Sequence, residues 1–128
     1  MASIMDMLLG AETSKLIERQ SAIMKVTRLA EQLGFPFELE LVGLTSRELD
    51  NLPAEDRPVY TILKGVKNID FSNQALAEKF KSDGRQTPLT PPEVVRALFL
   101  PGEINGIASA IFDLSGFGSK ALEKIEKN

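Results

Sequence analysis

The chain has 128 residues, of which 43% are hydrophobic and 26% are charged, and its formal net charge is −3. This composition is typical of one soluble globular domain, residues 1–128, and excludes a disordered chain, a basic nucleic-acid footprint and an acidic tail. The chain has no cysteine and no histidine, which excludes disulfides, thiol catalysis, Ser-His-Asp chemistry and most zinc sites.

The sequence also argues against a membrane protein or an exported protein. Its longest strongly apolar stretch, Val94–Leu100, is far shorter than the ~20 residues that span a bilayer. The first residues lack the positive region of a signal peptide and include Asp6. We therefore expect a protein that stays in the cytoplasm where it is made, with no membrane, nucleic acid, metal or cofactor bound to it.

The N-terminal residues 1–10 are predicted to form a short helix. Ser3 and Asp6 have the spacing of a helix cap, and Gly10 ends the pattern. Apolar residues recur on one helical face: Ile4, Met5, Leu8 and Leu9. About two turns of helix are unstable alone and must pack on something. Either the helix belongs to the core of this domain, or it is a detachable arm for a partner.

A β-hairpin is expected over residues 22–43. In the second strand, Phe37, Leu39 and Leu41 alternate with Glu38 and Glu40, which is typical of a half-buried strand. The preceding segment, 11–33, fits helical spacing and period two alike. Because a lone strand leaves its backbone groups unpaired, the stretch 24–30 is predicted to be the first strand, joined through the turn residues 32–36.

Residues 45–128 carry helical patterns only. Thr45 and Glu48 form a capping box, Pro58 occupies a first-turn position, and Asp70 or Ser72 is expected to cap the next helix. The connection 82–88 is polar.

The strongest helix-start signal is Thr90-Pro91-Pro92-Glu93, and a second helix follows from Pro101. Gly116 and Gly118 indicate a glycine stop, after which a last helix is predicted from Ser119. The predicted fold class is α+β and helix-dominated: a small N-terminal β-hairpin followed by a compact helical body of about five short helices.

Three groups of residues could suggest chemistry, and each has a structural explanation. Glu38 and Glu40 occupy the solvent face of an alternating strand. The acidic cluster of Asp50, Glu55 and Asp56 lacks the ligand spacing of an EF-hand. The segment 116–119 follows a helix and lacks both phosphate-loop fingerprints. We therefore predict a non-enzymatic protein with no catalytic residues.

The C-terminal third carries a specific resemblance. It reads Leu98-Phe99-Leu100-Pro101-Gly102-Glu103-Ile104, then Leu114-Ser115-Gly116-Phe117-Gly118, then the charged end Glu123-Lys124-Ile125-Glu126-Lys127-Asn128. This order resembles the XkdN-like tail assembly chaperones of contractile-tailed phages and prophages. The hairpin region and residues 5–10 are similar more loosely. Gly43 departs from the family pattern, which has Arg-Ala-Leu there, and Leu33-Gly34 lengthens the hairpin connection.

The resemblance implies a chaperone that binds the tape measure protein, keeps it soluble, helps the tail tube assemble around it and is absent from the finished virion. The tail tube protein is a second candidate partner, and a second copy of the chain is a third. The resemblance brings no catalytic residue.

The candidate binding surface combines the N-terminal helix with the C-terminus. Its members are Ile4, Met5, Leu8, Leu9, Phe117, Leu122 and Ile125. The alternative is that these side chains are intramolecular core. Two other functions stay open at this point. One is a structural tail-completion or connector protein. The other is a small enzyme that uses two converging carboxylates.

Overall fold

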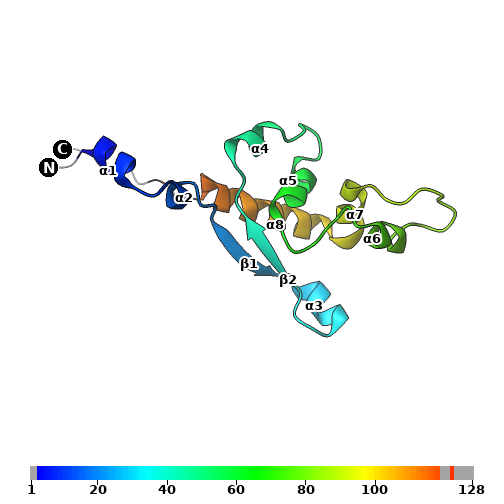
Figure 1. Cartoon of the computed structure of the whole chain (residues 1–128). Helices are drawn as coiled ribbons and strands as arrows, with labels where there is room; N and C mark the ends of the chain where they lie inside the picture. The colour runs from blue at the N-terminus through cyan, green and yellow to red at the C-terminus, as the bar shows by residue number, and fades with distance from the viewer. Residues whose placement is uncertain (1–2, 119–121, 123–128) are drawn as a thin grey trace.

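A computed structural model describes residues 3–118 and 122 (Figure 1). The first half of the chain contains α1 (Ile4–Gly10), α2 (Thr13–Leu16), β1 (Ser21–Lys25), α3 (Thr27–Leu33) and β2 (Glu38–Val42). The second half contains α4 (Ser46–Asp50), α5 (Arg57–Gly65), α6 (Gln74–Lys79), α7 (Pro91–Leu98), α8 (Pro101–Phe112) and the π-helical turn η1 (Asp113–Phe117). The predicted class is confirmed: a helix-dominated α+β fold with one antiparallel strand pair.

The predicted position of the first strand is wrong. β1 comprises Ser21–Lys25 and pairs antiparallel with β2, with Met24 opposite Leu39. Of the stretch 24–30 predicted as strand, residues 27–30 instead belong to α3, which buries Leu29 and Ala30. Gly34 ends α3 in the left-handed conformation, at φ 75°, which glycine adopts without steric cost. The sequence of this segment fits the helical period and the strand period equally well. Burial of one helical face in the tertiary structure favours the helix.

Local signals fixed most helix starts. The capping box of Thr45 and Glu48 begins α4, and Pro58 lies in the first turn of α5. For α6 the predicted cap is wrong. Asn73 caps it, accepting a hydrogen bond from the Leu76 amide at 3.0 Å. Asp70 instead accepts hydrogen bonds from the backbone N–H and the hydroxyl of Ser72, forming a turn before the helix.

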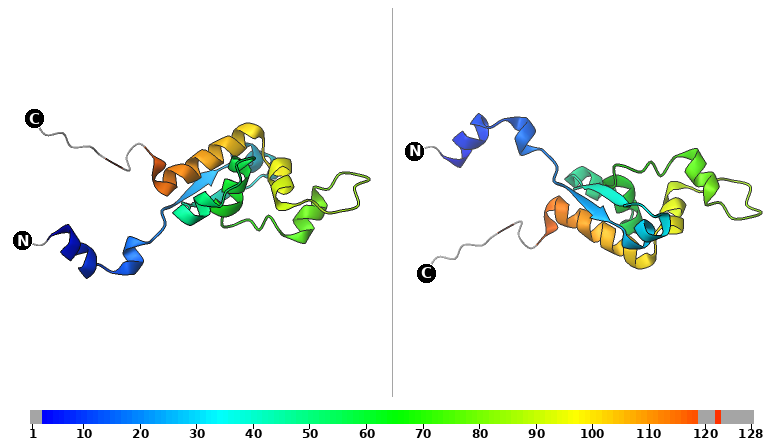
Figure 2. Two further views of the ribbon diagram at one scale, coloured as in Figure 1. Left: turned by 90° about the horizontal axis from the view of Figure 1, so that it is seen from above. Right: turned by 90° about the horizontal axis from the view of Figure 1, so that it is seen from below.

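The core lies between β2 and the helices α5, α7 and α8. Leu39 and Leu41 of β2 point inward, since alternate strand residues face one side of a sheet. Figure 2 shows α8 running along the strand pair and α5 beside it. α5 and α8 approach closely at Gly65, where a β-carbon would lie 2.6 Å from Cδ1 of Ile111. The missing side chain therefore sets the spacing between these two helices.

The end of α8 is fastened to the end of β2. The Ser115 hydroxyl donates to the Ile111 carbonyl at 2.7 Å and accepts from the Leu44 amide at 2.8 Å. Gly116 has φ 99°, as a glycine stop requires, so the predicted end of this helix is confirmed. The last helix predicted from Ser119 lies outside the described residues.

Two bidentate ion pairs hold connecting segments against the helices. Arg28 at the start of α3 donates to Glu103 at 2.8 and 3.0 Å and to the Leu98 carbonyl at 2.9 Å. Arg85 donates to Glu93 at 2.6 and 2.8 Å and thereby ties the polar connection 82–88 to α7. Planar guanidinium–carboxylate pairs of this kind combine charge with fixed geometry.

The Arg85–Glu93 pair predicts a pH dependence of stability. Hydrogen bonds from Arg85 and then from Thr90 lower the pKa of Glu93 from 4.5 to about 2. A carboxyl group whose folded-state pKa is lowered stabilises the fold above its unfolded pKa, and this stabilisation is lost as pH falls from about 4.5 to 2. We expect Glu93→Gln to be less stable than wild type at pH 7 and to lose less free energy of unfolding over this window.

Urea unfolding at several pH values measures this difference, and Glu55→Gln serves as the control because Glu55 is exposed. Parallel pH profiles for wild type and Glu93→Gln would contradict the prediction.

Candidate partner-binding surface

The first helix forms by local capping. The Ser3 hydroxyl accepts a hydrogen bond from the Asp6 amide at 3.1 Å, and the Asp6 carboxylate accepts one from the Ser3 amide at 3.2 Å. Such a capping box satisfies two backbone donors at a helix start. It stabilises a helix of only seven residues. Nucleation is too costly for a helix this short to be stable without tertiary contacts.

None of the residues of α1 is buried, although Ile4, Met5, Leu8 and Leu9 recur at the spacing of one helical face. Ile4 and Leu9 are 74% and 78% exposed, and Met5 and Leu8 are also exposed. These four residues therefore lie outside the core of the described chain. Contiguous exposed apolar side chains of this kind typically mark an interaction surface.

The exposed segment is longer than the ten residues expected from the sequence. We define the N-terminal arm as residues 3–19, every one of which is exposed. Its further apolar side chains are Met7, Leu16 and Ile17, which the sequence interpretation did not assign to a binding surface. For Leu16 and Ile17 the available signal was their isolation between the polar residues 12–15 and 18–20.

The arm is anchored where it meets the strand pair. Arg19 forms an ion pair with Glu48 at 3.1 Å, and the Gly43 amide donates to the Gln20 carbonyl at 2.9 Å. The pKa of Glu48 is lowered by the backbone hydrogen bond from Thr45 and further by the charge of Arg19. Figure 2 shows the arm projecting away from the helical body beyond this point.

The C-terminal candidate Phe117 lies in η1, whose residues 114–116 adjoin the base of the arm. Phe117 is 67% exposed, and its ring contacts that of Phe112 edge to face, with centroids 6.0 Å apart. Leu122 is exposed too, and Ile125 lies outside the described residues. A shallow hollow of about 350 Å³ joins the two regions. It is lined by the base of the arm (16–20), by 43–46 and by 114–116.

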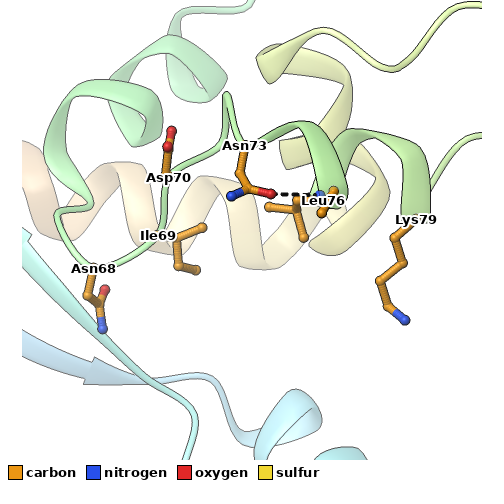
Figure 3. Close-up of a pocket in the computed structure, with 7 residues that line it drawn as sticks. Asn68, Ile69, Asp70, Asn73, Leu76 and Lys79 are labelled. Carbon is orange, nitrogen blue, oxygen red and sulfur yellow. Dashed lines mark hydrogen bonds between the residues drawn. The ribbon is translucent and has the colours of Figure 1, made fainter.

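Two other hollows among the described residues each contain a single carboxylate. Figure 3 shows the pocket of about 400 Å³ beside α6, where Asp70 is the one lining carboxylate and Lys79 lies at the far end. Hydrogen bonds from Ser72 lower the pKa of Asp70, so this carboxylate is committed to the turn before α6. A hollow of about 310 Å³ between α5 and α8 likewise contains one carboxylate, that of Asp56.

Two further features of the described residues concern other kinds of site. Residues 3–118 and 122 contain no group of three or more acidic side chains placed to hold a metal ion. In the same part of the chain, no single helix has the length and apolarity to cross a membrane. The pair formed by α7 and the segment 101–117 is long enough, but it bends by 115° at its break.

Comparison with known proteins assigns the helical body to a protein family. A family model described as phage XkdN-like tail assembly chaperone protein matches residues 52–128, which is more than half of the chain. No curated protein and no solved structure matches the chain. The matched range begins just before α5, so the arm and the strand pair lie outside it. This chain belongs to the XkdN-like family of phage tail assembly chaperones.

Proposed function

We propose that the protein binds the tape measure protein through its N-terminal arm and keeps that partner soluble until the tail tube encloses it. One observation supports this proposal above the others: the apolar face of α1 is exposed along its whole length on a member of a tail assembly chaperone family. Phe117 and Leu122 would extend the surface, because the C-terminal turn adjoins the base of the arm.

The physical basis is the binding of an amphipathic helix to apolar stripes on a partner helix. A marginal helix such as α1 becomes stable when its apolar face is covered, so binding and helix formation are coupled. Burying one leucine side chain contributes roughly 1.5–3 kcal/mol, and part of this is offset by the ordering of the arm. Contacts of this strength are reversible, as displacement by the tube requires.

The chaperone role also implies where the protein acts and how it leaves the partner. The chain would act as one domain bearing an arm, in the cytoplasm of the bacterial host, without catalysis. Several copies along one long tape measure chain would gain avidity from individually weak contacts. The protein would leave before the virion is complete, and the tail tube protein is its second candidate partner.

The test is co-purification of the tagged full chain with the tape measure protein of the same phage. We expect wild type to retain it and Leu8→Asp/Leu9→Asp to bind at least tenfold more weakly, because two charges replace two apolar contacts. The matched control is Leu33→Asp/Phe35→Asp, which alters two exposed apolar residues outside the arm. Thermal unfolding of both variants should match wild type, since neither pair belongs to the core.

Equal retention by the two double variants would remove the arm as the binding site. The competing role, a structural tail-completion or connector protein, predicts that the chain stays in the particle. Mass spectrometry of purified virions separates the two roles. A stoichiometric amount of the chain in mature particles would overturn the chaperone proposal.

A further inference from the structure

The two edges of the strand pair differ. The outer edge of β2 is closed by the chain that follows α5. The Lys67 amide donates to the Glu40 carbonyl at 2.8 Å. The side chain of Asn68 donates to the Glu38 carbonyl at 2.8 Å and accepts from the Glu40 amide at 3.0 Å. An asparagine side chain thus takes the place of a neighbouring strand, and Val66 forms a bridge with Leu41.

The outer edge of β1 has no such cover in the part of the chain that the structure describes. Two backbone hydrogen bonds show which residues of β1 bond to β2. The Val26 amide donates to the Phe37 carbonyl, and the Gly43 amide donates to the Gln20 carbonyl. The even-numbered residues of β1 therefore bond to β2, and Ser21, Ile23 and Lys25 direct their N–H and C=O groups outward. An uncovered edge of this kind is a template for another strand.

The geometry points to a second copy of this chain as the occupant of the β1 edge. If two β1 strands pair antiparallel about a two-fold axis at Ile23, that residue faces its own copy and Ser21 faces Lys25 of the partner subunit. All three pairs then use the outward backbone groups and form two hydrogen bonds each. The result is a four-stranded sheet in the order β2-β1-β1-β2.

The side chains of β1 are self-complementary in this register. On the face toward α8, Ala22 lies opposite Met24 of the partner subunit, so a small side chain meets a large one. On the other face, Ile23, which is 61% exposed, packs on Ile23 of the partner subunit. Lys25, the one charged residue of the strand, lies at the far end from its own copy, so no like charges face each other.

The surface beside β1 has room for an added strand. A hollow of about 290 Å³ lies between the end of β1 and α8, and Met24, Val26 and Ile107 contribute to its lining. Gly106 also lines it, and a β-carbon added there would meet nothing within 4 Å. At this end of β1, a side chain that an added strand directs toward α8 therefore meets open space. Self-pairing does not depend on the arm and stands apart from the proposed function.

Cysteine cross-linking tests the register directly, because the native chain contains no cysteine. A hydrogen-bonded antiparallel pair has a Cα–Cα distance of about 5.5 Å, within the range that a disulfide spans. We expect Ile23→Cys to form a covalent dimer under mild oxidation. Ser21→Cys and Lys25→Cys should not cross-link alone, since each would lie roughly 13 Å from its own copy. A mixture of the two should cross-link.

Sedimentation velocity of the unmodified full chain tests the dimer itself. We expect wild type to sediment as a dimer and Ile23→Lys as a monomer, because two lysines would face each other at the axis. Ile23→Pro should also be monomeric, and it should keep the β1–β2 ladder because only an outward N–H is lost. Phe35→Lys is the matched control, as Phe35 is exposed but lies outside the edge.

Three results would overturn the inference. The first is a monomeric wild-type protein at about 100 µM, a concentration that populates even micromolar dimers. The second is cross-linking of Ser21→Cys or Lys25→Cys alone as fast as Ile23→Cys. The third is a combined result: wild type is monomeric, and the Ile23→Lys variant no longer retains the tape measure protein. This result would assign the β1 edge to that partner instead. If only the arm variant Leu8→Asp/Leu9→Asp loses retention of the tape measure protein, the inferred dimer is unaffected.

Discussion

Gly65→Ala is expected to lower the free energy of unfolding by about 1–3 kcal/mol, although alanine is ordinarily the better helix residue. The new β-carbon would lie 2.6 Å from Cδ1 and 2.8 Å from Cγ2 of Ile111. Both residues are buried, and Ile111 is fully enclosed at the contact between α5 and α8. The isoleucine side chain cannot rotate away into solvent, so the two helices must separate.

A double-mutant cycle makes this prediction specific to one contact. Ile111→Ala alone should cost roughly 2–5 kcal/mol, since it leaves a cavity in the core. In Gly65→Ala/Ile111→Ala the new methyl group occupies part of that cavity, so the combined loss should be smaller than the sum of the single losses. Urea unfolding of the four proteins measures the coupling. Gly102→Ala is the control, because a β-carbon there meets nothing within 4 Å.

Additive losses in this cycle, or a Gly65→Ala protein as stable as wild type, would show that the helix spacing is not set at Gly65.

Gly43→Ala is expected to be at least as damaging, with a loss of roughly 3 kcal/mol. A β-carbon at this position would overlap the carbonyl oxygen of Leu114 and lie 2.7 Å from its carbonyl carbon. Here the obstacle is main chain, which no change of rotamer relieves. The overlap would push η1 away from the end of β2 and break the hydrogen bond from the Leu44 amide to Ser115, 2.8 Å long.

Two measurements check this prediction. Urea unfolding gives the loss of stability, and amide hydrogen exchange should show faster exchange at Leu44 in the variant than in wild type. Gly10→Ala is the matched control, because it also replaces a glycine but meets nothing within 4 Å. Unchanged exchange at Leu44 together with unchanged stability would contradict the close approach of β2 and η1.

Gly43 also marks a departure from the family pattern. The resemblance led us to expect Arg-Ala-Leu around this residue, and glycine interrupts it. In this fold the end of β2 approaches the backbone of η1 too closely for a side chain. The glycine is therefore a packing requirement, and it lies opposite the turn that ends the most specific part of the resemblance, 114–118.

Local chemistry explains which features the sequence determined by itself. The capping residues of α1, α4 and α7 act within three residues, and Pro58 and Pro101 fix the first turns of α5 and α8 through their own rings. Such interactions need no distant partner, so they can be predicted from the sequence alone. The C-terminal motifs likewise placed the chain in its family, and the matched family model confirms it.

Only the tertiary structure decided which apolar residues are covered. α1 and α8 both carry apolar side chains at helical spacing, yet Leu9 is 78% exposed and Ile111 is fully buried. The same holds for residues 21–33, where 27–33 form a helix that packs on the body and, within the described residues, β1 keeps one uncovered edge. Hydrophobic spacing predicts that a helix or strand face will be covered. Which distant segment covers that face depends on the packing of the whole chain.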